Sequence, residues 1–434
     1  MNVSIIGAGV TGLAAGMTAG APVYEQSDGP GGICRSYYLR AGEHISTDHA
    51  PPDDDAYRFE VGGGHWIFGR DEKVLAWLAG LAPLRRYERH AVVRLPAGKS
   101  VPYPLQAHTE ALGHELALQI ASERAAGASP PTEARTLRDW LQQSFGQTLC
   151  EMFFFPFHDR YSAGLSDVVA PQDDYKSPQL KPSAGGPLGY NAEFRYPSGG
   201  LDALVGAMAA RCDIRYGKRL VRLDRLAHRL EFSDGSETSY DTVVSTLPLH
   251  RAVALAGLEV GEPADPFTSV LVLNIGAERG GSCPQVHWQY EPHAEAGFHR
   301  IGFYSNVDRS FLPKAFRHDG DHVALYVERA FPRGAAPTTS EIAEYTEAVI
   351  AELRQREYIG ATHVVSPSWV EVAYTWRIPG SPWREEAIAA LAAYEIRQVG
   401  RYGRWHFQGI ADSVREGLAM GEQLAANLLP SYDS

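Results

Sequence analysis

The sequence has no long apolar run and no secretory leader, and each absence excludes a class of protein. No stretch approaches the roughly 18 apolar residues that cross a bilayer. No basic start is followed by an apolar core and a small-residue cleavage site. The first expected strand starts at Asn2, which would leave no room for a leader. We therefore expect a cytoplasmic protein with no membrane partner.

Cysteine is scarce and dense basic clusters are missing. The four cysteines lie far apart, without a CxxC pair or metal-ligand spacing. Reduced thiols are therefore favoured over disulfides, and no metal site is expected. The net charge is −12, with no dense Lys/Arg run, which argues against a nucleic-acid partner. An anionic ligand would need a few cationic side chains concentrated locally.

A short strand and the glycines that follow it predict a dinucleotide-binding fold. The apolar run Val3–Ile6 precedes the motif GAGVTG. Gly7 would make the tight turn, Gly9 would let the backbone approach a pyrophosphate, and Gly12 would let helix and strand pack closely. The N-terminus of the next helix would face the phosphates with free N–H groups. A glycine turn without a ligand is the alternative.

An acidic residue completes this motif. Glu25 ends the second expected strand, where its carboxylate can accept hydrogen bonds from the ribose hydroxyls of an adenosine. The spacing from Gly7 to Glu25 is shorter than the usual ~20 residues but suits a short crossover helix. Gly32 and Arg35 follow, and they resemble the second phosphate contact of FAD proteins of the amine-oxidase and nucleotide-sugar-mutase superfamily. An exposed loop arginine is the competing interpretation of Arg35.

The length and the order of patterns predict more than one domain. The 434 residues exceed the ~250–300 at which one core stops growing. We expect an α/β fold in which a Rossmann-type FAD-binding domain carries a helical insertion and an antiparallel β-sheet substrate domain. The expected ranges are 1–85, 198–262 and 395–434 for the FAD-binding domain, 105–190 for the helical domain, and 86–104 with 263–394 for the sheet domain.

Hydrophobic periodicity places elements within these domains. Helices are expected over 72–84, most of 107–160, 201–210, 339–356 and from about Asp412 onward, and an irregular loop over 164–190. A hairpin is expected over 88–104. Further strands are expected at Ile214, 220–223, 230–232, 243–246, 270–273, 286–288, 300–303 and 323–326.

Five further segments carry a resemblance that covers most of the chain. Together they resemble the UDP-galactopyranose mutase family, nearest its eukaryotic-type branch. The match over 110–185 is loose. The segments, in order, are Gly62–Phe68, Val101–Gln106, Asn191–Pro197, Arg300 leading to Ser305-Asn306, and Gly400–Trp405.

The resemblance implies an isomerase in which FAD is not a net redox agent. In that family reduced FAD is the nucleophile: its N5 atom attacks the anomeric carbon, UDP departs, and the sugar recloses in the other ring size. This is covalent catalysis. The nucleotide-sugar substrate would be UDP-galactose or a relative such as UDP-arabinose. Because no NAD(P)H domain is visible, NAD(P)H or another reductant would reach the flavin in passing or through another protein.

By position, the resemblance assigns residues to the flavin. Gly63, Gly64 and His65 would lie against the isoalloxazine and respond to its redox state. A histidine bonded only within its loop is the alternative for His65. Val221 would lie near the adenine. Asp412 would stand where the last helix meets the flavin, unless it is simply a helix cap.

The resemblance also assigns residues to the substrate. Tyr103 and Gln106 would hold the uracil, and Arg300 would neutralise the pyrophosphate, which makes His65 and Arg300 the expected catalytic residues. Ordinary core packing and an isolated surface arginine are the alternatives. The remaining substrate assignments are Phe153, Phe157 and His158 in the uridine pocket, Asn191 and Tyr290 at the nucleotide or phosphates, and Asn306 and Phe407.

The match fails at the substrate diphosphate. Val307, Ile378 and Phe407 occupy the positions of three tyrosines that contact it in the family. The second phosphate arginine has no clear equivalent, and Lys176 is the nearest cation. Because each unpaired polar group costs ~1–3 kcal/mol, these losses predict an altered pose or an altered sugar.

Three hypotheses remain from the sequence, and all leave the oligomeric state open. The first is a UDP-sugar pyranose–furanose mutase. The second is an FAD-dependent amine-oxidase-like oxidoreductase acting on a small molecule without a diphosphate. The third is an FAD-stabilised protein that binds a partner without catalysis.

Overall fold

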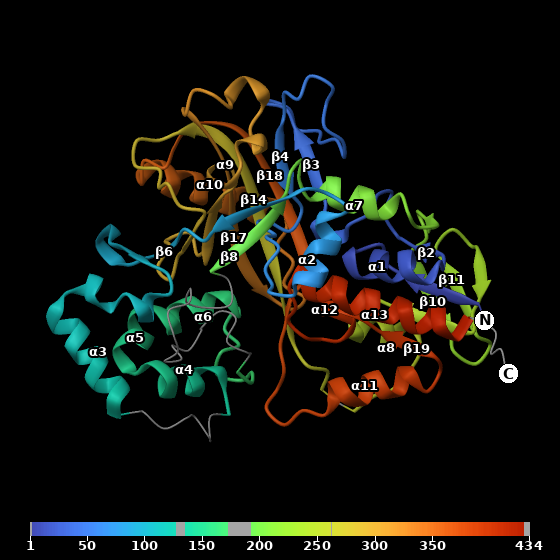
Figure 1. The fold of residues 1–434 in the computed structure, drawn as a ribbon. Helices are drawn as coiled ribbons and strands as arrows, with labels where there is room; N and C mark the ends of the chain where they lie inside the picture. Colours follow the sequence, from blue (N-terminus) through green and yellow to red (C-terminus); the bar gives the residue numbers. More distant parts are fainter. Residues whose placement is uncertain (1, 127–134, 172–191, 262, 429–434) are drawn as a thin grey trace.

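The structure is a computed structural model, and it describes residues 2–126, 135–171, 192–261 and 263–428. Figure 1 shows a dinucleotide-binding unit that contains the first and the last described elements, β1 and α13, an antiparallel sheet beside it, and a cluster of short helices below that sheet. This arrangement confirms the predicted α/β fold class.

A five-stranded parallel sheet forms the first unit, and its strands come from distant parts of the chain. All five strands are short, and the three central ones, β13, β1 and β2, are buried throughout, as is typical of a parallel sheet covered on both faces. The spatial order is β19 (Ile396–Gln398), β13 (Thr242–Ser245), β1 (Val3–Ile6), β2 (Val23–Tyr24) and β9 (Ile214–Arg215).

Helices cover both faces of this sheet because successive residues of β1 point to opposite sides. Ile5 packs in the same core as Leu13 of the first helix, whereas Ile6 packs with Leu249 on the other face. The first face carries α1 (Val10–Ala19), with α7 (Leu201–Ala209) and α13 (Ile410–Leu428) packed on it. The second face carries α8 (Leu249–Leu255) and α11 (Trp383–Ala392).

The second unit is a seven-stranded sheet that is antiparallel except where β15 pairs with β6. The expected hairpin over 88–104 forms its edge. In spatial order the strands are β18 (Ile359–Thr375), β14 (Phe267–Arg279), β17 (His322–Pro332), β16 (Arg300–Phe303), β15 (Trp288–Tyr290), β6 (Ala91–Arg94) and β7 (Ser100–Pro102).

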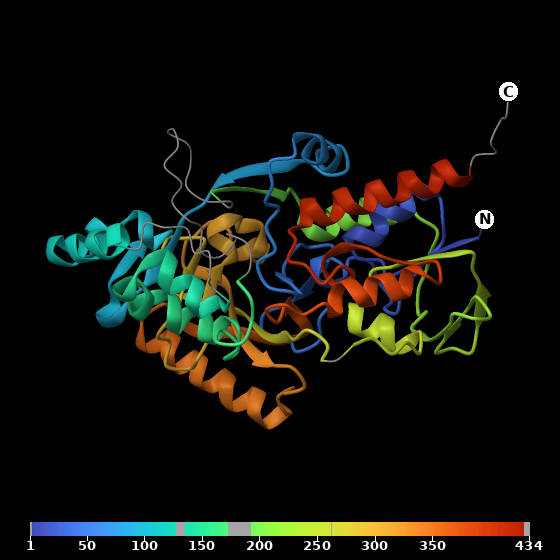
Figure 2. The same cartoon turned by 90° about the horizontal axis from the view of Figure 1, so that it is seen from below.

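The alternation of side chains divides this sheet into two faces with different neighbours. Leu271 and Leu273 of β14 pack with Val349 of α10 (Thr339–Gln355), which lies across the outer face (Figure 2). Val270 and Val272 point the other way, into the core shared with the dinucleotide-binding unit. The inner face of the sheet is therefore the one that can meet a bound cofactor.

The helical insertion and three small sheets complete the fold. The insertion contains α3 (His114–Ala126), α4 (Leu137–Phe145), α5 (Gln147–Leu149), a π-helical turn (Cys150–Phe154) and α6 (Phe155–Tyr161). Two short helices, α9 (Tyr304–Val307) and α12 (Gly400–Gly403), and α2 (Glu72–Ala79) lie elsewhere. The small sheets are β3 (Ser36–Leu39) with β4 (Tyr57–Glu60), β5 (Leu84–Glu88) with β8 (Glu193–Pro197), and β10 (Leu220–Asp224) with β11 (Arg229–Phe232) and β12 (Glu237–Ser239).

Most expected elements are present, and the differences have physical causes. Helix α11 falls inside the range expected for the sheet domain, yet Trp383 and Leu391 pack against α8 and β19. The long strand β18 was not predicted, and its first half is largely half-buried or exposed, which weakens the apolar signal. The division into domains stays a prediction.

Neither a membrane-spanning helix nor a cluster of metal ligands occurs among the described residues. No helix of these ranges is both long and apolar enough to cross a membrane. In the same part of the chain, no group of three or more His, Cys, Asp or Glu side chains is placed to hold a metal ion.

Candidate functional site

A cavity of about 570 Å³ runs from the carboxyl ends of the parallel strands to the inner face of the antiparallel sheet. Its lining begins with Ile6 at the end of β1, Glu25 after β2 and Thr246 after β13. Ligands of open α/β sheets bind at this edge. The cavity ends at Trp288, Tyr290 and the other inner-face residues described below.

The glycine turn has the geometry expected for close approach of a pyrophosphate. Gly7 has φ +98°, and a Cβ atom there would lie 2.2 Å from Thr246 Oγ1. A Cβ on Gly12 would lie 1.9 Å from Gly7 O, so Gly12 allows α1 to pack on the turn. A Cβ on Gly9 would meet no atom within 4 Å, because Gly9 borders the cavity. No side chain caps the start of α1, so its first N–H groups face this space.

Glu25 is held at the cavity by hydrogen bonds from the backbone around it. Its Oε2 accepts from Ala8 N at 2.7 Å, and its Oε1 accepts from Ser27 N at 2.9 Å and Ser27 Oγ at 2.7 Å. The carboxylate is nearly fully buried and belongs to the lining. This position suits an acceptor for the hydroxyls of a ribose.

Of the next two expected residues, Gly32 and Arg35, only Gly32 lies at the cavity. Gly32, with φ +57°, lines the cavity. Arg35 does not: its side chain turns away toward Asp28 and Asp48, with nitrogen–oxygen distances of 3.6 and 3.7 Å. The expected flavin-side phosphate contact of Arg35 therefore has no support in this geometry.

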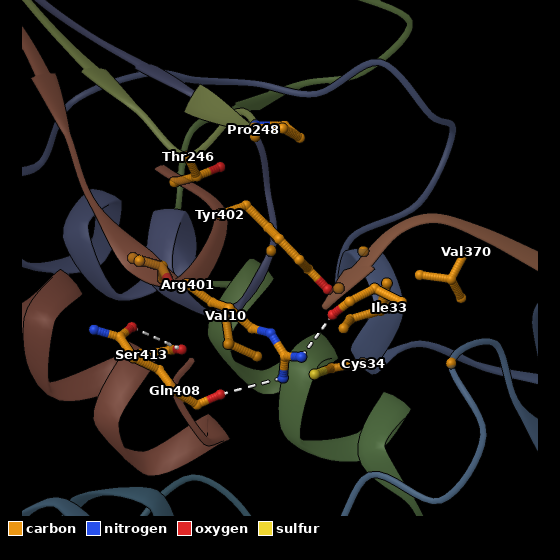
Figure 3. A pocket seen from close by; sticks show the side chains of 18 of the residues that line it. Val10, Ile33, Cys34, Thr246, Pro248, Val370, Arg401, Tyr402, Gln408 and Ser413 are labelled. Atoms are coloured by element: carbon orange, nitrogen blue, oxygen red, sulfur yellow. Dashed lines mark hydrogen bonds between the residues drawn. The ribbon is translucent and has the colours of Figure 1, made fainter. Parts of the chain in front are cut away.

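A different arginine lies in the middle of the cavity. Arg401 of α12 extends between Gln408 and the Ile33–Cys34 segment (Figure 3). It donates from Nη2 to Ala373 O at 2.6 Å and from Nη1 to Gln408 O at 3.4 Å. Its Nε is buried without a hydrogen-bond partner, and no carboxylate of the described residues pairs with the guanidinium. Arg401 is thus a partly buried cation available to an anionic ligand.

The expected flavin loop lies against the cavity. Gly62, Gly64 and His65 line it, whereas Gly63 faces the inner sheet. His65 Nδ1 lies 3.1 Å from Gly63 O. Burial lowers the pKa of His65 to about 4, so the imidazole is neutral at physiological pH. Glycines are required here because a Cβ on Gly64 would lie 2.2 Å from Tyr326 Oη.

Arg300 lies in the cavity wall, but its charge is already paired. Its Nε donates to Glu328 Oε2 at 2.8 Å and its Nη2 to Glu328 Oε1 at 2.5 Å. Both residues line the cavity. Burial raises the pKa of Glu328, but the charge of Arg300 and a hydrogen bond from His299 outweigh it, and the pKa falls to about 2. The pair therefore carries no net charge.

Aromatic side chains surround this pair at the inner end of the cavity. Trp288, Tyr290, Tyr374 and Phe407 belong to the lining. The ring of Tyr103 packs 4.6 Å from that of Tyr290 between centroids. The recess formed by the lining aromatics can stack a planar ring.

Other residues expected at the uridine lie behind Tyr290 and outside the lining. Phe157 meets the Tyr290 ring edge-on at 5.2 Å, and Phe153 lies 6.4 Å from it. Gln106 is buried. His158 is also buried, and its Nδ1 lies 2.8 Å from Phe154 O within its own helix. The structure thus brings these residues to one side of the recess without exposing them to it.

Three expected ligand contacts lie elsewhere. Val221 is 47% exposed and outside the lining, which Leu220 joins instead, because adjacent residues of β10 point to opposite sides. Asp412 forms an ion pair with Arg415 at 2.9 Å, and Ser413 lines the cavity in its place. Asn306 donates to the carbonyls of Pro284 and Val286 in a loop contact.

Two expected substrate residues, Lys176 and Asn191, lie outside the described residues. Of the three positions where tyrosine is replaced, Phe407 lines the cavity, whereas Val307 and Ile378 do not.

Sequence reasoning did not identify Glu328, Tyr374 or Arg401 as site residues. Glu328 and Tyr374 are single residues within long strands, and only the strand register brings them to the cavity. Arg401 stood in a matching segment without a role. A signal was nevertheless present in the sequence, because Arg401 lies between Gly400 and Gly403, shortly after strand β19.

Comparisons with known proteins identify the family and the fold. The family model of the flavin containing amine oxidoreductases matches residues 21–420. No curated protein matches the sequence.

Solved structures share the fold at low sequence identity. A reduced UDP-galactopyranose mutase has a TM-score of 0.80 and 20% identity, and the alignment covers 99% of this chain and 96% of the other. An oxidoreductase from Methanosarcina mazei has a TM-score of 0.60, 15% identity and coverages of 98% and 100%. A putrescine oxidase bound to putrescine has a TM-score of 0.58, 17% identity and coverages of 98% and 99%.

Proposed function

The chain belongs to the flavin containing amine oxidoreductase family, whose members use FAD, and we propose that it is a nucleotide-sugar mutase. The reaction would interconvert the pyranose and furanose forms of a UDP-sugar, such as UDP-galactose or UDP-arabinose. When bound, reduced FAD would supply a nucleophile for the anomeric carbon, from which UDP leaves.

The residues of the cavity fit FAD at several points. The glycine turn and the uncapped start of α1 suit its pyrophosphate, and Glu25 suits the ribose of its adenosine. Arg401 would add a cation in the middle of the cavity. The inner end beside His65 then remains for the isoalloxazine and the substrate.

The observation that carries the mutase proposal is the recess at this inner end, where Tyr290 and Arg300 lie together. Tyr290 would stack on the uracil ring, and Arg300 would donate to a phosphate oxygen. Trp288 and Phe407 would exclude water from the anomeric carbon. Neutral His65 would hold its loop against the cofactor through Gly63 O.

The test is an isomerisation assay on the FAD-loaded protein reduced with dithionite. UDP-galactopyranose and UDP-arabinopyranose are supplied separately, and furanose products are separated by chromatography. The proposal expects turnover only after reduction, with no reductant consumed per product. Stoichiometric oxidation of the sugar nucleotide, or no furanose from either substrate, would contradict it.

The second candidate is an amine-oxidase-like oxidoreductase acting on a small molecule without a diphosphate. The observation in its favour is the Arg300–Glu328 pair, because a neutral pair offers little to a diphosphate. This activity expects oxygen consumption and reduction of bound FAD by the substrate. Stable oxidised FAD in the presence of a panel of small amines would count against it.

A further inference from the structure

The register of two neighbouring strands places Glu328 directly opposite Arg300. In the β16–β17 ladder Arg300 pairs with Glu328, and Gly302 pairs with Tyr326. Both side chains of the first pair point to the inner face of the sheet and line the cavity. The guanidinium uses two of its three nitrogens on this one carboxylate.

Packing holds the carboxylate of Glu328 in place. A Cβ atom on Gly63 would lie only 2.9 Å from Glu328 Oε1, so the loop rests directly on it. On the other side, His299 Nε2 lies 3.4 Å from Glu328 Oε2. The side chain of Glu328 is 2% exposed, and that of Arg300 is 15% exposed. The carboxylate therefore has little room to move away from an incoming ligand.

The charges decide what this arrangement does to a ligand. A phosphate group near Arg300 would also lie near a fixed negative charge in a partly buried site, where Coulombic interactions are strong. To bind Arg300 fully, the ligand must displace one or both hydrogen bonds to Glu328. A phosphate that must replace two hydrogen bonds to Glu328 therefore binds Arg300 less favourably than it would bind an unpaired guanidinium.

We propose that Glu328 is an internal counter-ion that competes with phosphate-bearing ligands for Arg300 and so limits their affinity at the inner end of the cavity. Glu328 thereby acts as a specificity-determining residue of the site. As applied to a UDP-sugar, this inference rests on the proposed function. The competition for Arg300 itself concerns any anion that enters the recess.

The experiment compares the FAD-loaded wild type with Glu328→Gln, in which the shape is kept and the charge removed. Inorganic pyrophosphate, UDP and uridine are titrated against each protein, with the flavin absorbance as the signal. The proposal expects a gain in affinity of about tenfold or more for pyrophosphate and UDP. Uridine carries no phosphate, so its affinity is expected to stay within about twofold.

A second buried pair of the same sheet domain is the matched control. Glu291 pairs with Arg356 at 2.8 Å, is as deeply buried as Glu328, and lies outside the cavity lining. Glu291→Gln should lose similar stability without any gain in pyrophosphate affinity. If Glu328→Gln fails to fold, Glu328→Met, an uncharged side chain of similar length, takes its place.

Each outcome bears on the proposal. Unchanged or weaker pyrophosphate binding after removal of the Glu328 charge would overturn it, because Glu328 would then only orient Arg300. Failure of pyrophosphate and UDP to bind either protein would overturn it as well. A pyrophosphate gain without any isomerisation would leave the competition standing and remove the mutase function. Isomerisation without a gain in pyrophosphate affinity would leave the mutase function standing and overturn the competition for Arg300.

Discussion

At the scale of single residues, Arg300 and Arg401 of the cavity lining differ in whether a carboxylate compensates their charge. Arg300 is held by Glu328, whereas the partners of Arg401 among the described residues are backbone carbonyls and aromatic rings. A partly buried cation without a carboxylate partner is costly unless a ligand supplies one. Arg401 is therefore the better candidate for a permanent contact with the cofactor.

Arg401→Gln should weaken FAD binding. A charge-assisted hydrogen bond contributes ~1.5–3 kcal/mol, so we expect about a 10- to 100-fold higher Kd for FAD. Arg404→Gln is the control, since Arg404 follows the same helix but its side chain is half exposed near Glu416. Titration of both apoproteins with FAD measures the effect, and equal Kd values would remove Arg401 from the cofactor site.

The second prediction at this scale concerns His65 and pH. Its folded pKa of about 4 lies below the ordinary value of about 6.5, so the unfolded chain binds the additional proton between these values. The free energy of unfolding therefore falls as the pH drops through this window. In His65→Gln this contribution is lost, and the difference between the two proteins should change between pH 6.5 and pH 4. Parallel denaturation curves across that range would contradict the assignment.

At the scale of elements, the glycines around α1 have separable roles. Gly9 borders the cavity with free space around a Cβ and φ −70°, so Gly9→Ala should leave the apoprotein stable. The added methyl group would occupy the space of the pyrophosphate and lower FAD affinity by about tenfold or more. Calorimetry of the apoprotein and FAD titration separate the two effects. A destabilised apoprotein would be the contrary result.

Gly12→Ala should instead destabilise the fold, because its Cβ would collide with the carbonyl of Gly7. We expect a loss of about 1–3 kcal/mol in the free energy of unfolding, as for other overpacked sites. Gly206→Ala in α7 is the control, since nothing lies within 4 Å of its added methyl group. That change should stabilise the protein by up to about 1 kcal/mol. Equal denaturation midpoints for the two variants would contradict the packing argument.

At the scale of the whole molecule, the cavity lies between two sheets that share a hydrophobic core but no strand pairing. Its lining includes Glu25 at one end and Tyr290 at the other, so a bound FAD would contact both units. Ligand at 100 times its Kd stabilises the folded state by about 2.7 kcal/mol. FAD should therefore raise Tm relative to the apoprotein in a concentration-dependent manner. An unchanged Tm at saturating FAD would argue against a cofactor that bridges the units.

The local sequence was sufficient for the dinucleotide end of the site. Gly7, Gly9 and Gly12 act within a few residues of one another, and Glu25 follows in the next strand, so a short pattern contains the required geometry. The expected flavin loop came instead from the resemblance to the mutase family. These features depend on backbone conformations that glycine alone adopts freely.

The tertiary structure decided the charge and the accessibility of the substrate end. Whether Arg300 is free or paired depends on the register of β16 and β17. Whether Arg35 or Arg401 enters the cavity depends on how distant loops fold over it. The sequence by itself determined the strand, the glycine turn and the helix start of the dinucleotide-type fold, because these interactions are local. It did not determine the balance of charge around the substrate, because that balance is set by side chains brought together only by long-range packing.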